Sequence, residues 1–153
     1  MKIVDILAPE AIVPEMRATS KLEAIEELAR ALAGLHPEIE ERRLVQVLLE
    51  REELGSTAIG EGIAIPHGKL PGVTGVLAAF GRSPRGLDFE SLDGGPTRLF
   101  FLLVAPEDSA GIHLKALARV SRLLKDRAFR ERLFAGASRA DLHATITAED
   151  EKY

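Results

Sequence analysis

The sequence predicts an α/β layered domain with a mixed β-sheet. Segments with apolar residues at helical spacing stand before and after a few short strand-like runs. Elements of these two kinds bury their apolar faces by packing in layers. The longest strongly apolar run, 99–105, indicates a buried strand and is far too short to cross a membrane. The chain of 153 residues is long enough for a hydrophobic core, and residues 1–153 are expected to form a single domain.

The first third of the chain is expected to hold one strand and two helices. Residues 3–7 predict a short helical turn, and residues 11–14 predict an edge strand, because its final proline cannot donate to a sheet. A capping-box pattern opens the segment 20–34 and a glycine closes it, which is typical of a helix. A second helix is expected over 37–51, starting at a proline.

The middle of the chain predicts further strands. Residues 75–81 enclose an apolar run between glycines and indicate a strand, and 85–95 is rich in turn residues. The run 99–105 is expected to be the central strand. A polar loop, 106–111, leads from it into a helix.

Three helices are expected after this loop. In the first, Leu114, Leu117, Ser121 and Leu124 share one predicted inward face, with Val120 beside it. The second carries Phe129, Leu133 and Phe134, and the third begins near Ser138, with Leu142 and Ile146 facing inward. Residues 147–153 are expected to form a frayed tail.

Composition narrows the possible functions. The net charge of −4 offers no general attraction for nucleic acid or anionic lipid. A cluster in the last third of the chain is expected to lie on solvated helix faces: Arg119, Arg122, Lys125, Arg127, Arg130, Arg132 and Arg139. The chain has no cysteine, which excludes thiolate catalysis and cysteine-ligated zinc. The N-terminus shows no signal peptide, so a reducing cytoplasm is the expected location.

The stretch 51–68 carries the densest set of special residues in the sequence. It leaves a charged helix, crosses three glycines, passes a short apolar run and stops at Pro66-His67-Gly68. Proline restricts the backbone before His67, and glycine frees the backbone after it. Neutral imidazole is a good nitrogen nucleophile, and a phosphorylated histidine can pass its group on. His67 is therefore a candidate phosphoryl acceptor. The alternative is a tight turn in which the ring only fills space.

His113 and Arg51 are candidates to assist His67. His113 falls in the first turn of a predicted helix, where free N–H groups and the helix dipole favour an anion. It can help only if the two rings meet in space; otherwise it is a surface residue. Arg51 is positioned in the sequence to supply a charged donor. His36 and His143 are expected to be structural, and no His-x-x-x-His pair supports a zinc site.

The stretch from Arg51 to Gly68 resembles the active-site signature of a known family. With Glu52, Ile59-Gly60 and the run 63–68, it is similar to the IIA domains of the bacterial phosphoenolpyruvate-dependent sugar phosphotransferase system, fructose–mannitol class. The resemblance extends from about residue 3 to residue 146. Within the class, the chain most resembles the stand-alone nitrogen-regulatory IIA proteins.

The resemblance implies a fold, a site and partners. The fold would be a mixed β-sheet sandwiched between helices. His67 would accept the phosphoryl group from a histidine phosphocarrier protein, and His113 would support it without carrying it. Arg51 and Glu61 fall at the family's charged active-site positions. No metal or organic cofactor is expected.

Several functions stay open at this point. The resemblance favours a regulatory phosphotransferase component that signals to target proteins such as a transporter or a sensor kinase. The first alternative is a sugar-specific IIA that passes phosphate to a separate IIB protein or permease. A binding module that has lost the chemistry and a hydrolase are weaker options. The retained candidate residues speak against a binding module that has lost the chemistry. The absence of a catalytic serine, a metal cluster or a pair of carboxylates speaks against a hydrolase.

Overall fold

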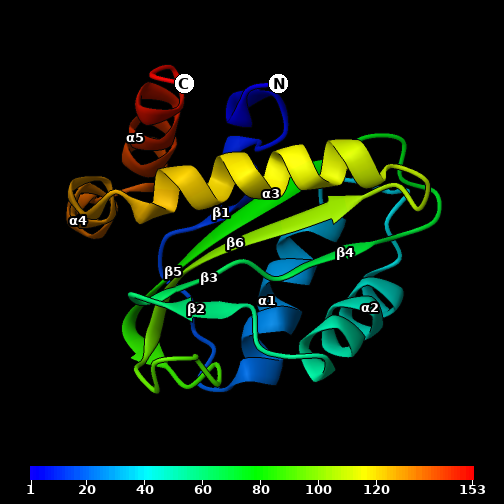
Figure 1. Ribbon diagram of the computed structural model, residues 1–153, viewed down its shortest axis with the longest axis horizontal. Helices are drawn as coiled ribbons and strands as arrows, with labels where there is room; N and C mark the ends of the chain where they lie inside the picture. The colour runs from blue at the N-terminus through cyan, green and yellow to red at the C-terminus, as the bar shows by residue number, and fades with distance from the viewer.

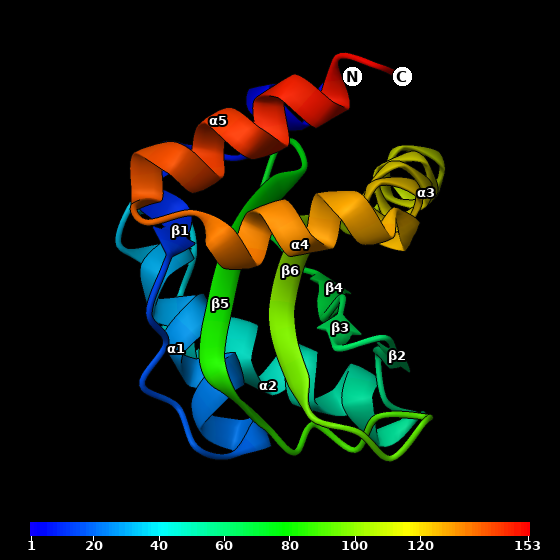
Figure 2. The ribbon, with the colours of Figure 1, turned by 90° about the vertical axis from the view of Figure 1, so that its left-hand side faces the viewer.

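The structure is a computed structural model that describes residues 1–153. A mixed β-sheet forms its centre, and helices cover both faces of the sheet (Figures 1 and 2). The strands are β1 (Ile12–Val13), β2 (Ala58–Gly60), β3 (Ile63–Ala64), β4 (His67–Lys69), β5 (Leu77–Leu87) and β6 (Thr97–Ala105). The helices are α1 (Lys21–Ala33), α2 (Glu41–Glu53), α3 (Ala110–Lys125), α4 (Arg127–Ala135) and α5 (Arg139–Asp150), with 3-10 turns η1 (Ile3–Asp5) and η2 (Pro9–Ala11).

Strand β6 lies at the centre of the sheet. It pairs with β5 in the antiparallel sense on one side and with both β3 and β4 in the parallel sense on the other. Strand β1 extends the sheet beyond β5, and β2 extends it beyond β3. Every residue of β6 except Arg98 is buried, which explains its nearly continuous apolar sequence. The predicted central strand and the mixed α/β architecture are both confirmed.

Two neighbouring residues of β5 show how the sheet separates two helical layers. A Cβ atom on Gly81 would lie 2.8 Å from Leu28 Cδ2 of α1. The next residue, Arg82, reaches the other way and binds carbonyl groups at the end of α4. Successive side chains of a strand point to opposite faces. Helices α1 and α2 therefore cover one face, and α3, α4 and α5 cover the other (Figure 2).

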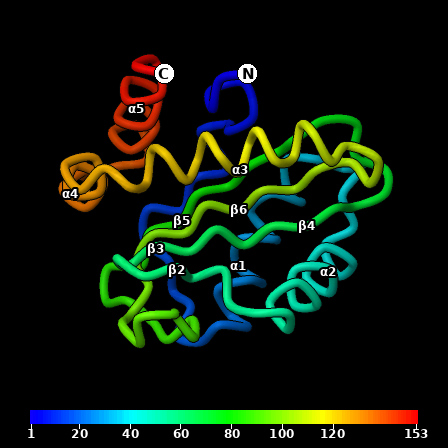
Figure 3. The backbone as a smooth tube through the Cα atoms, viewed as in Figure 1, coloured from blue at the N-terminus to red at the C-terminus, as the bar shows by residue number.

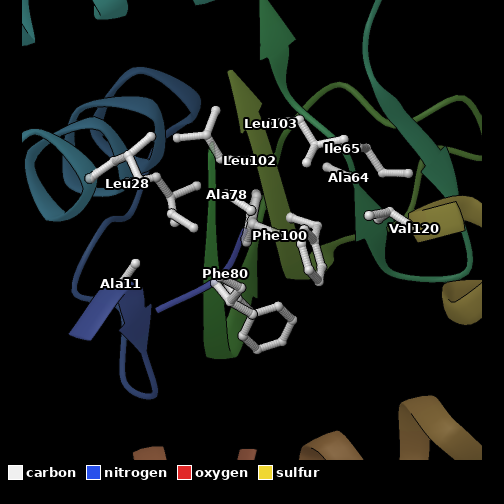
Figure 4. Close-up of a cluster of buried hydrophobic side chains, with 14 of the residues drawn as sticks. Ala11, Leu28, Ala64, Ile65, Ala78, Phe80, Phe100, Leu102, Leu103 and Val120 are labelled. Atoms are coloured by element: carbon white, nitrogen blue, oxygen red, sulfur yellow. The ribbon is translucent and has the colours of Figure 1, made fainter. Parts of the chain in front are cut away.

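The core fills the space between the sheet and these helices. Figure 4 shows Leu28 of α1 and Val120 of α3 on opposite sides of the strands, with Phe80 and Phe100 between them. Two edge-to-face aromatic pairs stabilise the packing. The ring centroids of Phe80 and Phe101 lie 5.7 Å apart, and those of Phe89 and Phe100 lie 5.3 Å apart.

Several predicted element boundaries are wrong, each for a physical reason. The second helix begins at Glu41 because Pro37 sits in a turn closed by a hydrogen bond from Ile39 N to His36 O. Strand β5 continues to Leu87, through residues predicted as turns. Pro84 is tolerated because β1 is too short to pair with that part of β5.

The buried face of α3 differs from the prediction by one residue along the helix. The inward residues are His113, Ala116, Val120, Leu123 and Leu124, whereas Leu114 is 66% exposed. Apolar residues occupy two adjacent stripes of this helix, so their spacing alone does not decide which stripe is buried. The observed rotation turns His113 toward the protein interior.

The chain termini lie close together, and the predicted frayed tail is instead well anchored (Figure 3). Helix α5 continues to Asp150, whose buried carboxylate accepts a hydrogen bond from Ile3 N at 2.6 Å. Arg119 of α3 pairs with the same carboxylate at 2.5 Å. The last helical turn is therefore tied to η1 and to α3. None of the helices combines the length and the apolar character needed to span a membrane.

We predict that Arg82→Met destabilises the fold by about 2–4 kcal/mol, because it leaves several carbonyl groups without a donor. Arg82 donates to Pro14 O at 3.0 Å, to Leu133 O at 2.8 Å and to Gly136 O at 2.6 Å. Urea denaturation measures the loss. The exposed Arg85 of the same strand supplies the control: Arg85→Met should cost less than about 0.5 kcal/mol. Equal stability of the two variants would contradict the role assigned to Arg82.

Candidate functional site

Three elements converge on a cavity of about 360 Å³ at one edge of the sheet. Strand β4 contributes His67 and Lys69, and the end of α2 contributes Glu50 and Arg51. Helix α3 contributes His113. These residues come from positions 50 to 113 of the chain and meet only through the fold.

The topology of the sheet explains why the two histidines meet. His67 is the first residue of β4 and lies opposite Leu103 of β6, with Leu103 N donating to Pro66 O at 3.0 Å. Strands β4 and β6 are parallel, so both carboxyl ends lie at the same edge of the sheet. Helix α3 begins five residues after β6 ends, and its first turn carries His113 back to this edge (Figure 1).

The rings of His67 and His113 are in direct contact. Their centroids lie 5.3 Å apart and their planes make an angle of 83°, an edge-to-face arrangement. His67 is half-buried and lines the open cavity, whereas His113 is buried. The Nε2 atom of His113 has no hydrogen-bond partner within the protein. A buried ring nitrogen without a partner is available to a group that enters the cavity.

A hydrogen bond fixes the tautomer of His67. Its Nδ1 atom lies 2.8 Å from Ile65 O. A carbonyl oxygen can only accept, so Nδ1 must carry the proton and Nε2 must carry the lone pair when the ring is neutral. The lone pair of the neutral ring therefore lies on Nε2, the nitrogen that is not bound to Ile65 O.

Burial keeps both rings neutral. It lowers the pKa of His67 below its ordinary 6.5; the Ile65 carbonyl and the Glu52 charge oppose this shift, and the Arg51 charge adds to it. Burial likewise lowers the pKa of His113, with further lowering by the charges of His67 and Lys69. At neutral pH the site therefore presents a lone pair rather than an imidazolium proton at Nε2 of His67.

Of the two predicted charged residues, the structure brings only Arg51 to the histidines. Arg51 lines the cavity, and its Nη1 donates to Gly55 O at 3.0 Å. Glu61 lies in the turn between β2 and β3, away from α2 (Figure 1), and does not line this cavity. Its carboxylate pairs with Arg130 of α4 at 3.3 Å, and its backbone N–H donates to Asp93. The fold gives Glu61 a contact with α4 rather than with His67.

Sequence reasoning missed Lys69 and Glu50 as residues of the cavity. Lys69 could have been found, because residues two apart on a strand point to the same face. Glu50 carried no distinguishing signal, since it stands among four consecutive charged residues. His36 and His143 do not line the cavity. No group of three or more His, Asp or Glu side chains is arranged to hold a metal ion.

Comparison with known proteins identifies the family. The family model "Phosphoenolpyruvate-dependent sugar phosphotransferase system, EIIA 2" matches residues 5–149. The chain belongs to this family. It is therefore a phosphoryl-transfer component of the phosphotransferase type, and the family resemblance seen in the sequence is confirmed.

Three relatives are informative about the branch of this EIIA family. A "Nitrogen regulatory protein" of Bradyrhizobium diazoefficiens is 47% identical over 95% of both chains. The crystal structure of the nitrogen regulatory protein IIA-Ntr from Neisseria meningitidis has a TM-score of 0.87 at 34% identity, covering 95% of this chain and 99% of that one. The mannitol enzyme IIA of Escherichia coli, solved in complex with phosphorylated enzyme IIB, has a TM-score of 0.77 at 25% identity, covering 94% and 99%.

We predict that Gly68→Ala disturbs the site by forcing β4 away from α2. A Cβ atom on Gly68 would lie 2.6 Å from Val47 Cγ1, and overpacking of this kind costs about 1–3 kcal/mol. Val47→Ala removes the clashing methyl group, so it should restore part of the stability lost in Gly68→Ala. Urea denaturation of the two single variants and the double variant measures this coupling. Additive losses would show that the two residues do not press on each other.

We predict that His67 makes the fold less stable in mild acid. The unfolded chain binds a proton near pH 6.5, whereas the native ring binds it only at lower pH. The unfolded state therefore holds more protons in this window, and the free energy of unfolding falls as pH drops below about 6.5. In His67→Gln this fall between pH 7 and pH 5 should be smaller than in the wild type. Parallel pH profiles for the two proteins would contradict the lowered pKa.

Proposed function

We propose that this EIIA protein is a phosphohistidine carrier in which His67 is the phosphorylated residue. The observation that carries the proposal is the contact of His67 with His113 in an open cavity, with Nδ1 of His67 tied to Ile65 O. Such an arrangement would supply the two things that phosphoryl transfer needs, a positioned nucleophile and donors for the phosphoryl oxygens.

The transfer step follows from the tautomer. The Nε2 lone pair of His67 forms a bond to phosphorus while the bond from phosphorus to the donor's histidine nitrogen breaks. The electron pair of the broken bond returns to the donor ring. The proton on Nδ1 stays in place, and Ile65 O stabilises the positive charge that the ring of His67 gains. No proton has to move during the step.

Three further side chains would support the transferred group. His113 Nε2 is buried without a partner in the protein and would donate to a phosphoryl oxygen. Arg51 and Lys69 line the same cavity and offer cationic donors. Because burial disfavours the charged form of His113, this ring would act as a neutral donor.

We infer that the carrier has a regulatory role of the nitrogen type and takes its phosphoryl group from a histidine phosphocarrier protein. Support comes from the 47% identity to a protein named for nitrogen regulation, with 95% of both chains covered. The alternative, a sugar-specific IIA, draws support from the mannitol enzyme IIA, which was solved with a phosphorylated IIB partner. Loss of fructose or mannitol uptake when this protein is removed would favour that alternative.

We predict that His67→Ala abolishes phosphorylation and that His113→Ala slows it by about 10²–10³-fold, the usual effect of removing one donor to a developing charge. The purified variants are mixed with a radiolabelled phosphorylated histidine phosphocarrier protein, and acid-labile label is followed over time. His36→Ala, which removes a histidine outside the cavity, serves as the control and should behave as the wild type. Wild-type labelling of His67→Ala would refute the assignment, and an unchanged rate in His113→Ala would make that ring a bystander.

A further inference from the structure

A buried carboxylate lies behind the cavity, in the last turn of α2. The side chain of Glu52 is only 4% exposed. Its Oε1 accepts a hydrogen bond from Thr57 N at 3.1 Å, and its Oε2 accepts one from the hydroxyl of Thr57. The ammonium group of Lys21, from α1, lies 3.0 Å from Oε1. Glu52 does not line the cavity, so it does not contact a group bound there.

Two further hydrogen bonds connect Thr57 to His67. The carbonyl oxygen of Thr57 accepts from Ile65 N at 3.1 Å. The carbonyl oxygen of Ile65 accepts from Nδ1 of His67 at 2.8 Å. Glu52 thus holds Thr57, Thr57 holds Ile65, and Ile65 holds the ring of His67.

We propose that Glu52 is a positioning residue for phosphoryl transfer, which orients the ring of His67 through Thr57 and Ile65. The inference rests on the proposed function, because it concerns the rate at which His67 accepts the phosphoryl group. Glu52 acts through other residues and touches neither the donor nor the transferred group.

The local backbone explains why an anchor is needed here. Strand β2 has three residues and β3 has two, so few sheet hydrogen bonds hold this segment. The segment between α2 and β2 is exposed at Leu54 and has a positive φ of 145° at Gly55. Side-chain hydrogen bonds replace the missing sheet contacts. Glu52 supplies two of them to Thr57, and Ser56 adds one to Phe89 O at 2.7 Å.

A loose ring would be costly for this reaction. Transfer requires Nε2 to point at the phosphorus atom of the incoming donor, and a displacement of about 1 Å can cost about 10²-fold in rate. The hydrogen bond to Nδ1 controls both the direction of the ring and its tautomer. If Ile65 shifts, both properties of His67 change together.

A second route from Glu52 to His67 is electrostatic, because the negative charge of Glu52 raises the pKa of His67. Two substitutions separate the routes. Glu52→Gln keeps an oxygen that accepts from Thr57 N but removes the charge. Glu52→Ala removes both. If positioning dominates, the glutamine variant keeps most of the activity; if charge dominates, the two variants fail equally.

The experiment measures phosphoryl transfer from a phosphorylated histidine phosphocarrier protein at several donor concentrations. For Glu52→Ala we expect the rate at saturating donor to fall about 10-fold or more, with the donor concentration for half-maximal rate unchanged. For Glu52→Gln we expect a loss within about 3-fold. Thr57→Val keeps the backbone donor and loses the hydroxyl, so its transfer rate should lie between those of the two Glu52 variants. It provides the test if the Glu52 variants do not fold.

Two controls keep the outcome decisive. Arg82→Met destabilises the fold at α4, on the other face of the sheet from α2. Its folded fraction should transfer at the wild-type rate, and this result would exclude a general effect of stability on the rate. The ¹⁵N chemical shifts of the His67 ring, read without any donor, should show the Nδ1–H tautomer in the wild type and a mixture in Glu52→Ala. A wild-type rate in Glu52→Ala, an unchanged ring spectrum, or equal loss in the alanine and glutamine variants would overturn the proposal. Absence of labelling in the wild type would instead refute the proposed function.

Discussion

The parallel pairing of β4 with β6 is the constraint on which the candidate site depends. Strand β6 pairs with β5 along one side and with β3 and β4 along the other, and its residues are buried almost throughout. It fixes β4 through the register of His67 with Leu103, and its carboxyl end leads into α3. One strand therefore places both histidines. A change in the register of β4 would move His67 away from His113 without altering either residue.

The sequence was sufficient for the architecture because most elements carry their own local signals. The Ser20 cap is an example: its hydroxyl accepts from Glu23 N at 3.2 Å, as the pattern predicted. The Glu23 carboxylate, however, accepts from Thr19 N rather than from Ser20 N, so the reciprocal bond that a capping box predicts is not formed. The ends of elements that are set by tertiary contacts were missed, because such contacts leave no signal in the local sequence. Asp150 looks like a polar tail residue until its contacts with Ile3 and Arg119 are known.

The site was predictable only in part, and the rotation of α3 shows why. His67 stands out because proline and glycine flank it, so local sequence points to it. His113 was singled out by its place in the first turn of a predicted helix, but only the family resemblance made it a neighbour of His67, since the apolar spacing of α3 put Leu114 inside. In the structure Leu114 is exposed, and His113 is buried together with Ala116, Val120 and Leu123 of the same helix. Glu52 was named only as part of a motif, and its buried hydrogen bonds depend on a loop that folds back onto α2.

Electrostatics at the cavity suits a site that changes state on phosphorylation. Two cations, Arg51 and Lys69, and one carboxylate, Glu50, line the cavity around neutral histidines. The surface is thus mildly positive although the chain as a whole carries −4. A phosphoryl group brings nearly two negative charges at neutral pH, enough to reverse the local sign. A partner that binds at this cavity would meet opposite net charges in the unphosphorylated and phosphorylated forms. The proposed carrier could therefore signal without a large change of shape.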